Sequence, residues 1–148
     1  MLNFVLMESG SDMAELYGSC LCGLIKYRVS QAPSRFYLCH CKQCQKVTGS
    51  SFAANMIAKP NSIEWLEGAT ELRHFEHPER AFSKTFCGLC GSGLPHINKS
   101  GTNLVIPAGS LDVSPSMHPS ANLFTAEQPE WLESGLKAKS FVAFPEGH

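Results

Sequence analysis

The sequence predicts a mainly β fold with little helix, and two observations support this prediction. Short strand-like runs recur along the chain, separated by turn residues such as those of Lys59–Asn61 and Asn98–Asn103. Helical periodicity is scarce, because only two short segments show it. Short strands at such close spacing are typical of an all-β sandwich or a barrel-like arrangement.

The turn residues bound each expected element. Gly, Pro, Asn and Ser mark the ends of the strands, as GSG does at Gly91–Gly93. In chain order the expected strands are Leu24–Val29, Phe36–Cys39, Phe52–Ala58, Ser62–Leu66, Leu72–Phe75, Ala81–Phe86, Leu104–Ala108 and Ala121–Thr125. A helical turn or two is expected at Gln43–Thr48, which ends at Gly49, a common helix stop. Another is expected at Glu130–Ser134, directly after Pro129.

Length and composition are those of one globular domain. The chain has 148 residues, of which 43% are hydrophobic and 17% charged, so it can bury a core without disulfides. Its formal net charge is −1 and it has no run of Lys and Arg, so nucleic acid is not an expected partner. No internal repeat or linker divides the chain.

The N-terminal stretch lacks the features of a secretory signal. It has a short apolar start but no basic region, and Glu8 and Asp12 follow at once. No apolar run approaches the roughly 18 residues that a membrane-spanning helix needs. We therefore expect a soluble, cytoplasmic protein with no membrane partner.

Seven cysteines fall into three groups along the chain. The groups are CLC (Cys20, Cys22), CHCKQC (Cys39, Cys41, Cys44) and CGLC (Cys87, Cys90). Thiols stay reduced inside cells, and a closed set of disulfides cannot use up an odd number of cysteines. The clusters therefore favour metal binding, with disulfides as the alternative.

Four of these cysteines predict a structural zinc site. Zinc prefers tetrahedral thiolate ligands at about 2.3 Å, and four protein ligands make a closed site. Pairing Cys20 and Cys22 with Cys87 and Cys90 gives such a set from segments far apart in the sequence. The site would tie the N-terminal strand to the later strands and stabilise the fold.

The remaining three cysteines predict a zinc site of another kind. Cys39, Cys41 and Cys44 can hold one zinc from a single loop and leave its fourth position open, as in a catalytic site. The alternative is a closed structural site with a fourth ligand from His40, another histidine or a cysteine of the other groups. His40 is a poor candidate, because the middle side chain of a C-x-C turn tends to point away from the ion.

The charge of a three-thiolate zinc indicates its chemistry. Three thiolates on a divalent ion leave a negative centre, which is a weak Lewis acid and poorly suited to activating water. Such a centre is suited to an incoming thiol, a soft fourth ligand whose sulfur stays nucleophilic and can attack a carbonyl carbon. The residues therefore favour thiol addition, or the making and breaking of a carbon–sulfur bond, over hydrolysis.

Three blocks of the sequence resemble a known family. GSCLCGLIKY, CHCKQCQKVTGSSF and FCGLCGSGL are similar to the signature blocks of the glutathione-dependent formaldehyde-activating enzyme family, also called the centromere protein V family. All seven cysteines are present at family-like spacing, and the resemblance runs from about Tyr17 to the PEWLES segment near Trp131. It leaves residues 1–16 as an N-terminal lead segment and residues 17–148 as a single zinc-binding domain.

The resemblance implies a fold, two zinc ions and an activity. The fold is a β-tent of short antiparallel sheets with zinc-binding loops. A structural zinc is implied at Cys20, Cys22, Cys87 and Cys90, and a catalytic zinc at Cys39, Cys41 and Cys44. The implied activity is that of a carbon–sulfur lyase, which forms or cleaves S-hydroxymethylglutathione from glutathione and formaldehyde. The expected partner is thus a small thiol such as glutathione, while a homo-oligomer is left open.

A second function stays open beside the enzyme. The same zinc sites could stabilise a non-catalytic module that binds a partner protein. Residues after the three-cysteine loop could line a substrate pocket: Lys46, Thr48, Gly49, Ser50 and Ser51. Four arginines could bind the carboxylates of a glutathione-like ligand: Arg28, Arg35, Arg73 and Arg80. A helix end at Thr48–Gly49 and solvated surface arginines are the favoured readings of these two sets. His96 and His118 carry no partner motif.

Overall fold

The computed structural model describes residues 15–147. Residues 1–14, which include most of the expected lead segment and of the stretch weighed as a secretory signal, lie outside the described residues. The strands are β1 Leu16–Ser19, β2 Lys26–Val29, β3 Arg35–Cys39, β4 Ala53–Ala58, β5 Ile63–Glu67, β6 Leu72–Glu76, β7 Ser83–Cys87, β8 Gly93–Leu94, β9 His96–Ile97, β10 Leu104–Pro107 and β11 Ala121–Leu123. The helices are α2 Lys42–Thr48 and α3 Trp131–Leu136, and the 3-10 turns are η1 Pro60–Ser62, η2 Ala69–Glu71, η3 Ala108–Ser110 and η4 Thr125–Glu127.

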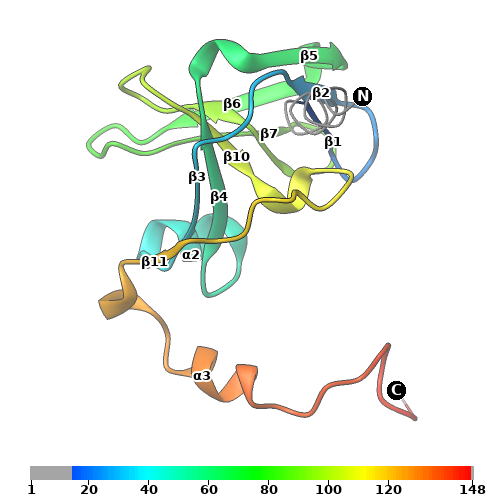
Figure 1. The fold of residues 1–148 in the computed structure, drawn as a ribbon, viewed down its shortest axis with the longest axis vertical. Helices are drawn as coiled ribbons and strands as arrows, with labels where there is room; N and C mark the ends of the chain where they lie inside the picture. Colours follow the sequence, from blue (N-terminus) through cyan, green and yellow to red (C-terminus); the bar gives the residue numbers. More distant parts are fainter. Residues whose placement is uncertain (1–14, 148) are drawn as a thin grey trace, which may run out of the picture.

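Three short sheets make up the fold (Figure 1). Their strand orders are β1-β2-β5, β11-β3-β4-β10-β9 and β6-β7-β8. Each sheet ends in two edge strands, so the barrel-like alternative is wrong, and the separate short sheets with little helix confirm the β-tent expectation. One pairing departs from the expected antiparallel order: β11 runs parallel to β3, because a long connection after β10 brings the chain back in the same direction.

All eight expected strands are present, with ends that differ by one or two residues. Both expected helical segments are present as α2 and α3. The sequence reasoning missed β1, β8 and β9. Strands β8 and β9 have two residues each and lie on either side of Pro95, so they are too short to show alternation.

The core is built from buried residues of all three sheets, among them Tyr27 of β2, Met56 of β4, Leu94 of β8 and Ile106 of β10. Tyr27 of β2 is fully buried, and its ring packs edge-on against Trp65 with the centroids 5.8 Å apart. The ring occupies the space next to Gly18, where an added Cβ would lie 2.3 Å from ring atoms. Its hydroxyl hydrogen-bonds to Ser110 Oγ at 2.6 Å, and burial raises the pKa of Tyr27 to about 12. Trp65 packs against the core, whereas Phe75 is 47% exposed.

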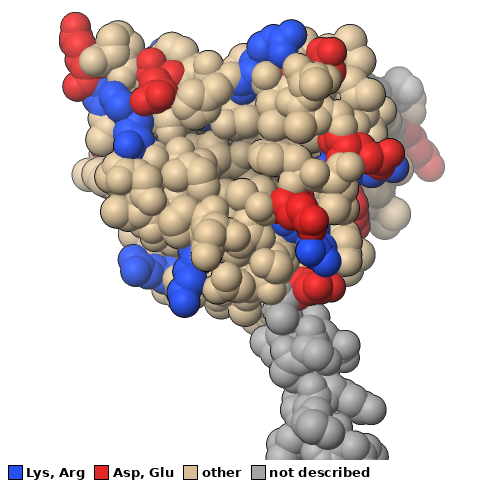
Figure 2. Space-filling view, turned by 90° about the horizontal axis from the view of Figure 1, so that it is seen from above, with Lys and Arg blue, Asp and Glu red and all other residues tan. Residues whose placement is uncertain are grey.

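After β11 the chain leaves the sheets. The segment that contains α3 runs away from the body of the molecule, in orange and red in Figure 1. Apolar side chains of this segment, including Trp131 and Leu136, are exposed. Figure 2 shows one face of the body, where acidic and basic side chains lie around the margin and neither sign forms a continuous patch. Within residues 15–147, no helix has the length and apolar character needed to cross a membrane.

Candidate metal centres

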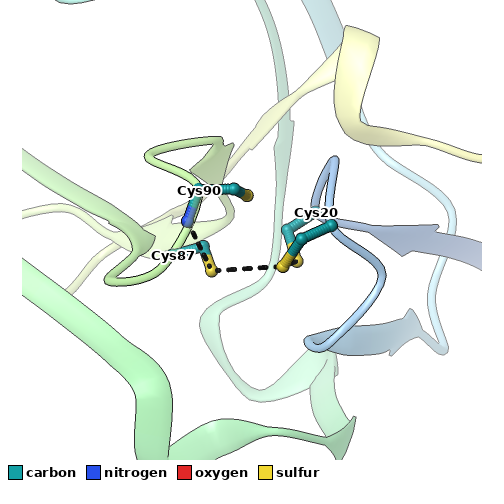
Figure 3. Close-up of side chains that lie close together, drawn as sticks. Cys20, Cys87 and Cys90 are labelled. Carbon is teal, nitrogen blue, oxygen red and sulfur yellow. Dashed lines mark hydrogen bonds between the residues drawn. The ribbon is translucent and has the colours of Figure 1, made fainter.

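Four cysteines from two distant loops come together as the sequence predicts. Cys20 and Cys22 lie in the turn between β1 and β2, Cys87 ends β7, and Cys90 lies in the loop before β8. Their four sulfur atoms all lie within 4.8 Å of one another. Figure 3 shows the two loops facing each other, with the sulfur atoms of Cys20 and Cys87 turned inward.

The sulfur spacing fits a tetrahedral metal site. The Cys20 and Cys22 sulfur atoms are 3.5 Å apart, and those of Cys22 and Cys87 are 3.9 Å apart. Ligands at 2.3 Å in a zinc tetrahedron lie about 3.8 Å from one another. Four soft thiol donors at this spacing could hold a zinc-like ion without a change of backbone.

Backbone amides point at the sulfur atoms of this group. Ile25 N–H donates to Cys20 Sγ at 3.3 Å, and the N–H groups of Leu89 and Cys90 donate to Cys87 Sγ at 3.4 and 3.5 Å. Hydrogen bonds of this kind favour the charged thiolate over the thiol. The local turns are therefore arranged for thiolates, the form that binds metal.

Ser92 links the two loops. Its hydroxyl oxygen accepts a hydrogen bond from Leu21 N–H at 2.9 Å and lies 3.2 Å from Cys90 Sγ. Hydrogen bonds from the Ser92 side chain and backbone lower the pKa of Cys90 to about 5. Gly91, between these two residues, has a φ of 78°, which a residue with a Cβ adopts only at a cost.

The other three cysteines lie at the junction of β3 and α2. Cys39 ends β3, Cys41 caps the N-terminus of α2, and Cys44 lies in its first turn. Their sulfur atoms also lie within 4.8 Å of one another, and Cys41 Sγ accepts a hydrogen bond from Cys44 N–H at 3.4 Å. Cys39 and Cys44 are buried, and burial raises the pKa of Cys44, whereas Cys41 is more open.

Strand β11 and the turn after it hold this loop in place. The His40 side-chain Nε2 lies 3.1 Å from Asn122 Oδ1. The Lys42 N–H donates to the Glu127 carboxylate at 3.0 Å, and the Gln45 amide donates to the Glu127 carbonyl at 2.9 Å. These contacts fix both the turn and the start of α2.

No fourth protein ligand joins the three-cysteine group within residues 15–147. No His, Cys, Asp or Glu ligand atom there lies within 4.8 Å of all three sulfur atoms. His40 is only 3% exposed, and its ring lies against Phe52 with the centroids 5.2 Å apart. The described residues therefore supply no ligand for the closed-site alternative, and His40 lies outside the group as expected.

Two adjoining cavities lie beside this group. One, of about 630 Å³, extends from Cys44 to Cys20, and the other, of about 560 Å³, is lined by all three cysteines of the group. Both volumes lie in the range of small-molecule sites. The residues common to both cavities are Cys44, Asn55, Phe82, Ser83 and His96.

Sequence reasoning assigned no role to two residues of these cavities. Burial and the nearby charge of Lys84 lower the pKa of His96 to about 4, so its ring is neutral at pH 7. Lys84 lies on β7 and lines the larger cavity. No sequence signal singled out Lys84, because Ser83 next to it on β7 lines the same cavity.

The polar residues after the three-cysteine loop serve mainly the helix end. Gly49 has a φ of 67°, and its N–H donates to Gln45 O at 2.8 Å, which confirms the helix stop. Thr48 lines the larger cavity, but its hydroxyl donates to Cys44 O at 2.8 Å. Lys46 is exposed and does not line either cavity.

Three of the four arginines considered as carboxylate ligands line neither cavity. Arg28 pairs with Glu15 and Glu64, and Arg73 lies 3.9 Å from Glu71. Of the four, Arg80 alone lines a cavity, the smaller one.

Comparisons with known proteins agree with this geometry. The family model of the glutathione-dependent formaldehyde-activating enzyme matches residues 15–127. A protein of Halomonas elongata that is named after the same enzyme is 27% identical over 141 residues, which cover 88% of this chain and 89% of the relative. The crystal structure of a Rhodobacter sphaeroides protein has a similar fold, with a TM-score of 0.57 and 18% identity over 73% of this chain and 99% of its own.

Proposed function

The chain belongs to the glutathione-dependent formaldehyde-activating enzyme family, and from this membership we propose that it is a zinc-dependent carbon–sulfur lyase. Its substrates are a small thiol such as glutathione and an aldehyde such as formaldehyde. The family match and the enzyme name of the Halomonas elongata relative support an enzyme of this kind.

One observation carries the proposal. Three sulfur atoms converge at Cys39, Cys41 and Cys44, the described residues bring no fourth ligand to them, and cavities adjoin the group. A structural site would use four protein ligands, and the other cysteine group offers four. The three-cysteine group therefore has the composition of a site that receives a ligand from outside.

The donor set selects the chemistry. Zinc bound by three thiolates would supply a soft, electron-rich site for an incoming thiolate and would activate water poorly. The chain holds these donors rigidly, because Cys41 caps α2 and Glu127 fastens the start of the helix. Cys39 and Cys44 are largely buried and lie at the wall of the smaller cavity.

The proposed reaction is an addition and its reverse. The thiol sulfur forms a bond to the carbonyl carbon, and the S–H proton passes to the carbonyl oxygen, so no oxidant or reductant is needed. Cleavage of the adduct returns the thiol and the aldehyde. The cavity walls orient the two reactants, which lowers the entropic part of the barrier.

The four-cysteine group has a different role in this proposal. Cys20, Cys22, Cys87 and Cys90 would hold a structural zinc that joins the β1–β2 turn to the loop after β7. The amide hydrogen bonds to Cys20 and Cys87 support thiolate ligands there.

Cobalt substitution tests the proposal. Glutathione at millimolar concentration should change the thiolate-to-metal absorption of the cobalt-loaded protein, and Cys41→Ser should abolish this response. The Cys90→Ser variant, altered in the other group, should keep the response wherever it folds. A protein that holds two metal ions, neither of which responds to glutathione, would instead favour the non-catalytic interaction module.

A further inference from the structure

The larger cavity contains a cationic side chain that forms neither an ion pair nor a hydrogen bond with the described residues. Lys84 is partly buried, and its Nζ makes no ion pair and no hydrogen bond with any residue from 15 to 147. Lys84 differs in this from several other cations of the described residues: Lys26, Arg28, Arg73 and Lys137 pair with glutamates, and Lys99 donates to two carbonyl oxygens. A partly buried ammonium group without a hydrogen bond costs stability, and a ligand that accepts one would offset this cost.

The neighbouring strand makes room for this ammonium group. Gly93 of β8 pairs with Phe86 of β7, two residues along the strand from Lys84. A Cβ at Gly93 would lie 2.6 Å from Lys84 Nζ. The missing side chain therefore lets Nζ rest against the β8 backbone, at the wall of the cavity.

The other charged lining residue does not neutralise Lys84. Among residues 15–147, Asp112 is the one acidic side chain on the larger cavity, and its Oδ1 accepts a hydrogen bond from Ser19 Oγ at 2.6 Å. His96 is uncharged at neutral pH. Lys84 thus provides the positive charge of a cavity that also reaches Cys44, and the two side chains interact electrostatically.

We propose that Lys84 binds a carboxylate of the thiol substrate while the sulfur of that substrate lies at the three-cysteine group. This inference rests on the proposed function for the position of the sulfur, and on the cavity for the position of the charge. It makes the preferred substrate a carboxylate-bearing thiol and disfavours a neutral thiol of the same size. A charge-assisted hydrogen bond to the ammonium group would offset the cost of its burial.

Paired ligands and a matched charge variant test the assignment. The affinities of the zinc-loaded protein for glutathione and for glutathione diethyl ester are measured by calorimetry in the wild type, Lys84→Met and Lys59→Met. Lys59 is exposed and lines neither cavity, so its variant removes the same charge elsewhere. The wild type and Lys59→Met should bind the acid about tenfold more tightly than the ester, and Lys84→Met should bind both alike. A Lys84→Met variant that keeps the wild-type preference would overturn the assignment.

A second variant distinguishes the loss of the ammonium group from a folding defect. Gly93→Ala keeps the lysine but displaces its ammonium group, so it should reduce the preference for the acid in the same direction. Thermal unfolding of Lys84→Met should occur at or above the wild-type temperature, because the variant removes a buried charge without a partner. A Gly93→Ala variant that folds and retains the full preference would also count against the assignment.

S-methylglutathione separates the two proposals, because it has the carboxylates but no thiol. If it binds as tightly as glutathione with the same dependence on Lys84, while the cobalt spectrum never responds to glutathione, the carboxylate site stands and the thiol function falls. If none of the three ligands binds, both fall.

Discussion

At the scale of the single residue, two glycines matter through the side chains they leave out. Gly18 leaves the space that the Tyr27 ring fills, and Gly93 leaves the space over which Lys84 Nζ lies. Tyr27 is the largest fully buried side chain of the described part of the chain, so the first glycine serves the core. Gly93 instead lines the candidate site.

Gly18→Ala should therefore destabilise the protein strongly. The new methyl group would lie 2.3 Å from the buried ring of Tyr27. The ring cannot shift freely, because its hydroxyl is hydrogen-bonded to Ser110 Oγ. We expect a loss of about 1–3 kcal/mol in the free energy of unfolding, measured by urea denaturation. Gly109→Ala is the control, because an added Cβ there meets nothing within 4 Å. Equal stability of the two variants would contradict this account of the core.

His96 should make the fold sensitive to acid. Its pKa is about 4 in the folded protein and about 6.5 in the unfolded chain, so protons bind the unfolded state more readily. The stability it contributes is complete above pH 6.5 and is lost as the pH falls toward 4. From pH 7 to pH 4.5 the wild type should lose about 2–3 kcal/mol more than His96→Gln does.

Chemical denaturation at both pH values measures this difference. The cysteines also titrate, but they are the same in the wild type and in His96→Gln, so their contribution cancels in the comparison. His118→Gln is the control, since His118 is exposed and should leave the acid sensitivity unchanged. A His96→Gln variant that loses as much stability as the wild type would show that burial does not disfavour the charged ring.

At the scale of the element, β11 supports the three-cysteine loop although it contributes no cysteine. Asn122→Ala should remove the partner of the buried His40 ring and cost about 1–3 kcal/mol of stability. It should also weaken cobalt binding at this group, because the loop that holds Cys39 and Cys41 is less fixed. Competition with a chromophoric chelator measures the affinity, and Asn61→Ala, at an exposed site, is the control. Unchanged metal affinity in Asn122→Ala would mean that the loop keeps its shape without β11.

Much of the fold and of the cysteine grouping could be predicted from turn residues and cysteine spacing. Gly49 located the end of α2, and KPN at Lys59–Asn61 located the end of β4. The spacing of the cysteines grouped all seven sulfur atoms as the structure has them. The parallel pairing of β11 with β3 was not predictable, because a strand pattern identifies a strand and not its partner. Lys84 was missed for a similar reason, since its lack of a partner is visible only in three dimensions.

At the scale of the whole molecule, the four-cysteine group joins two of the three sheets. Cys20 and Cys22 follow β1, and Cys87 belongs to β7 of another sheet. Cys87→Ser should therefore lower the free energy of unfolding by about 3 kcal/mol or more, since binding of a metal at such a site contributes to folding. Cys41→Ser should mainly remove one labile metal ion. Thermal unfolding with metal analysis of each variant separates the two roles, and equal unfolding by both would contradict the division.

The contacts of Asn122 and Glu127 with the three-cysteine loop also have a consequence for biosynthesis. The loop emerges from the ribosome early, more than seventy residues before the segment that clamps it. During translation its thiols are thus present on a nascent chain that still lacks these clamps. The contacts of this centre with Asn122 and Glu127 can therefore form only after translation has passed Glu127. A chain that ends before Glu127 but after Cys90 would have every cysteine and would lack the Glu127 contacts of the three-cysteine loop.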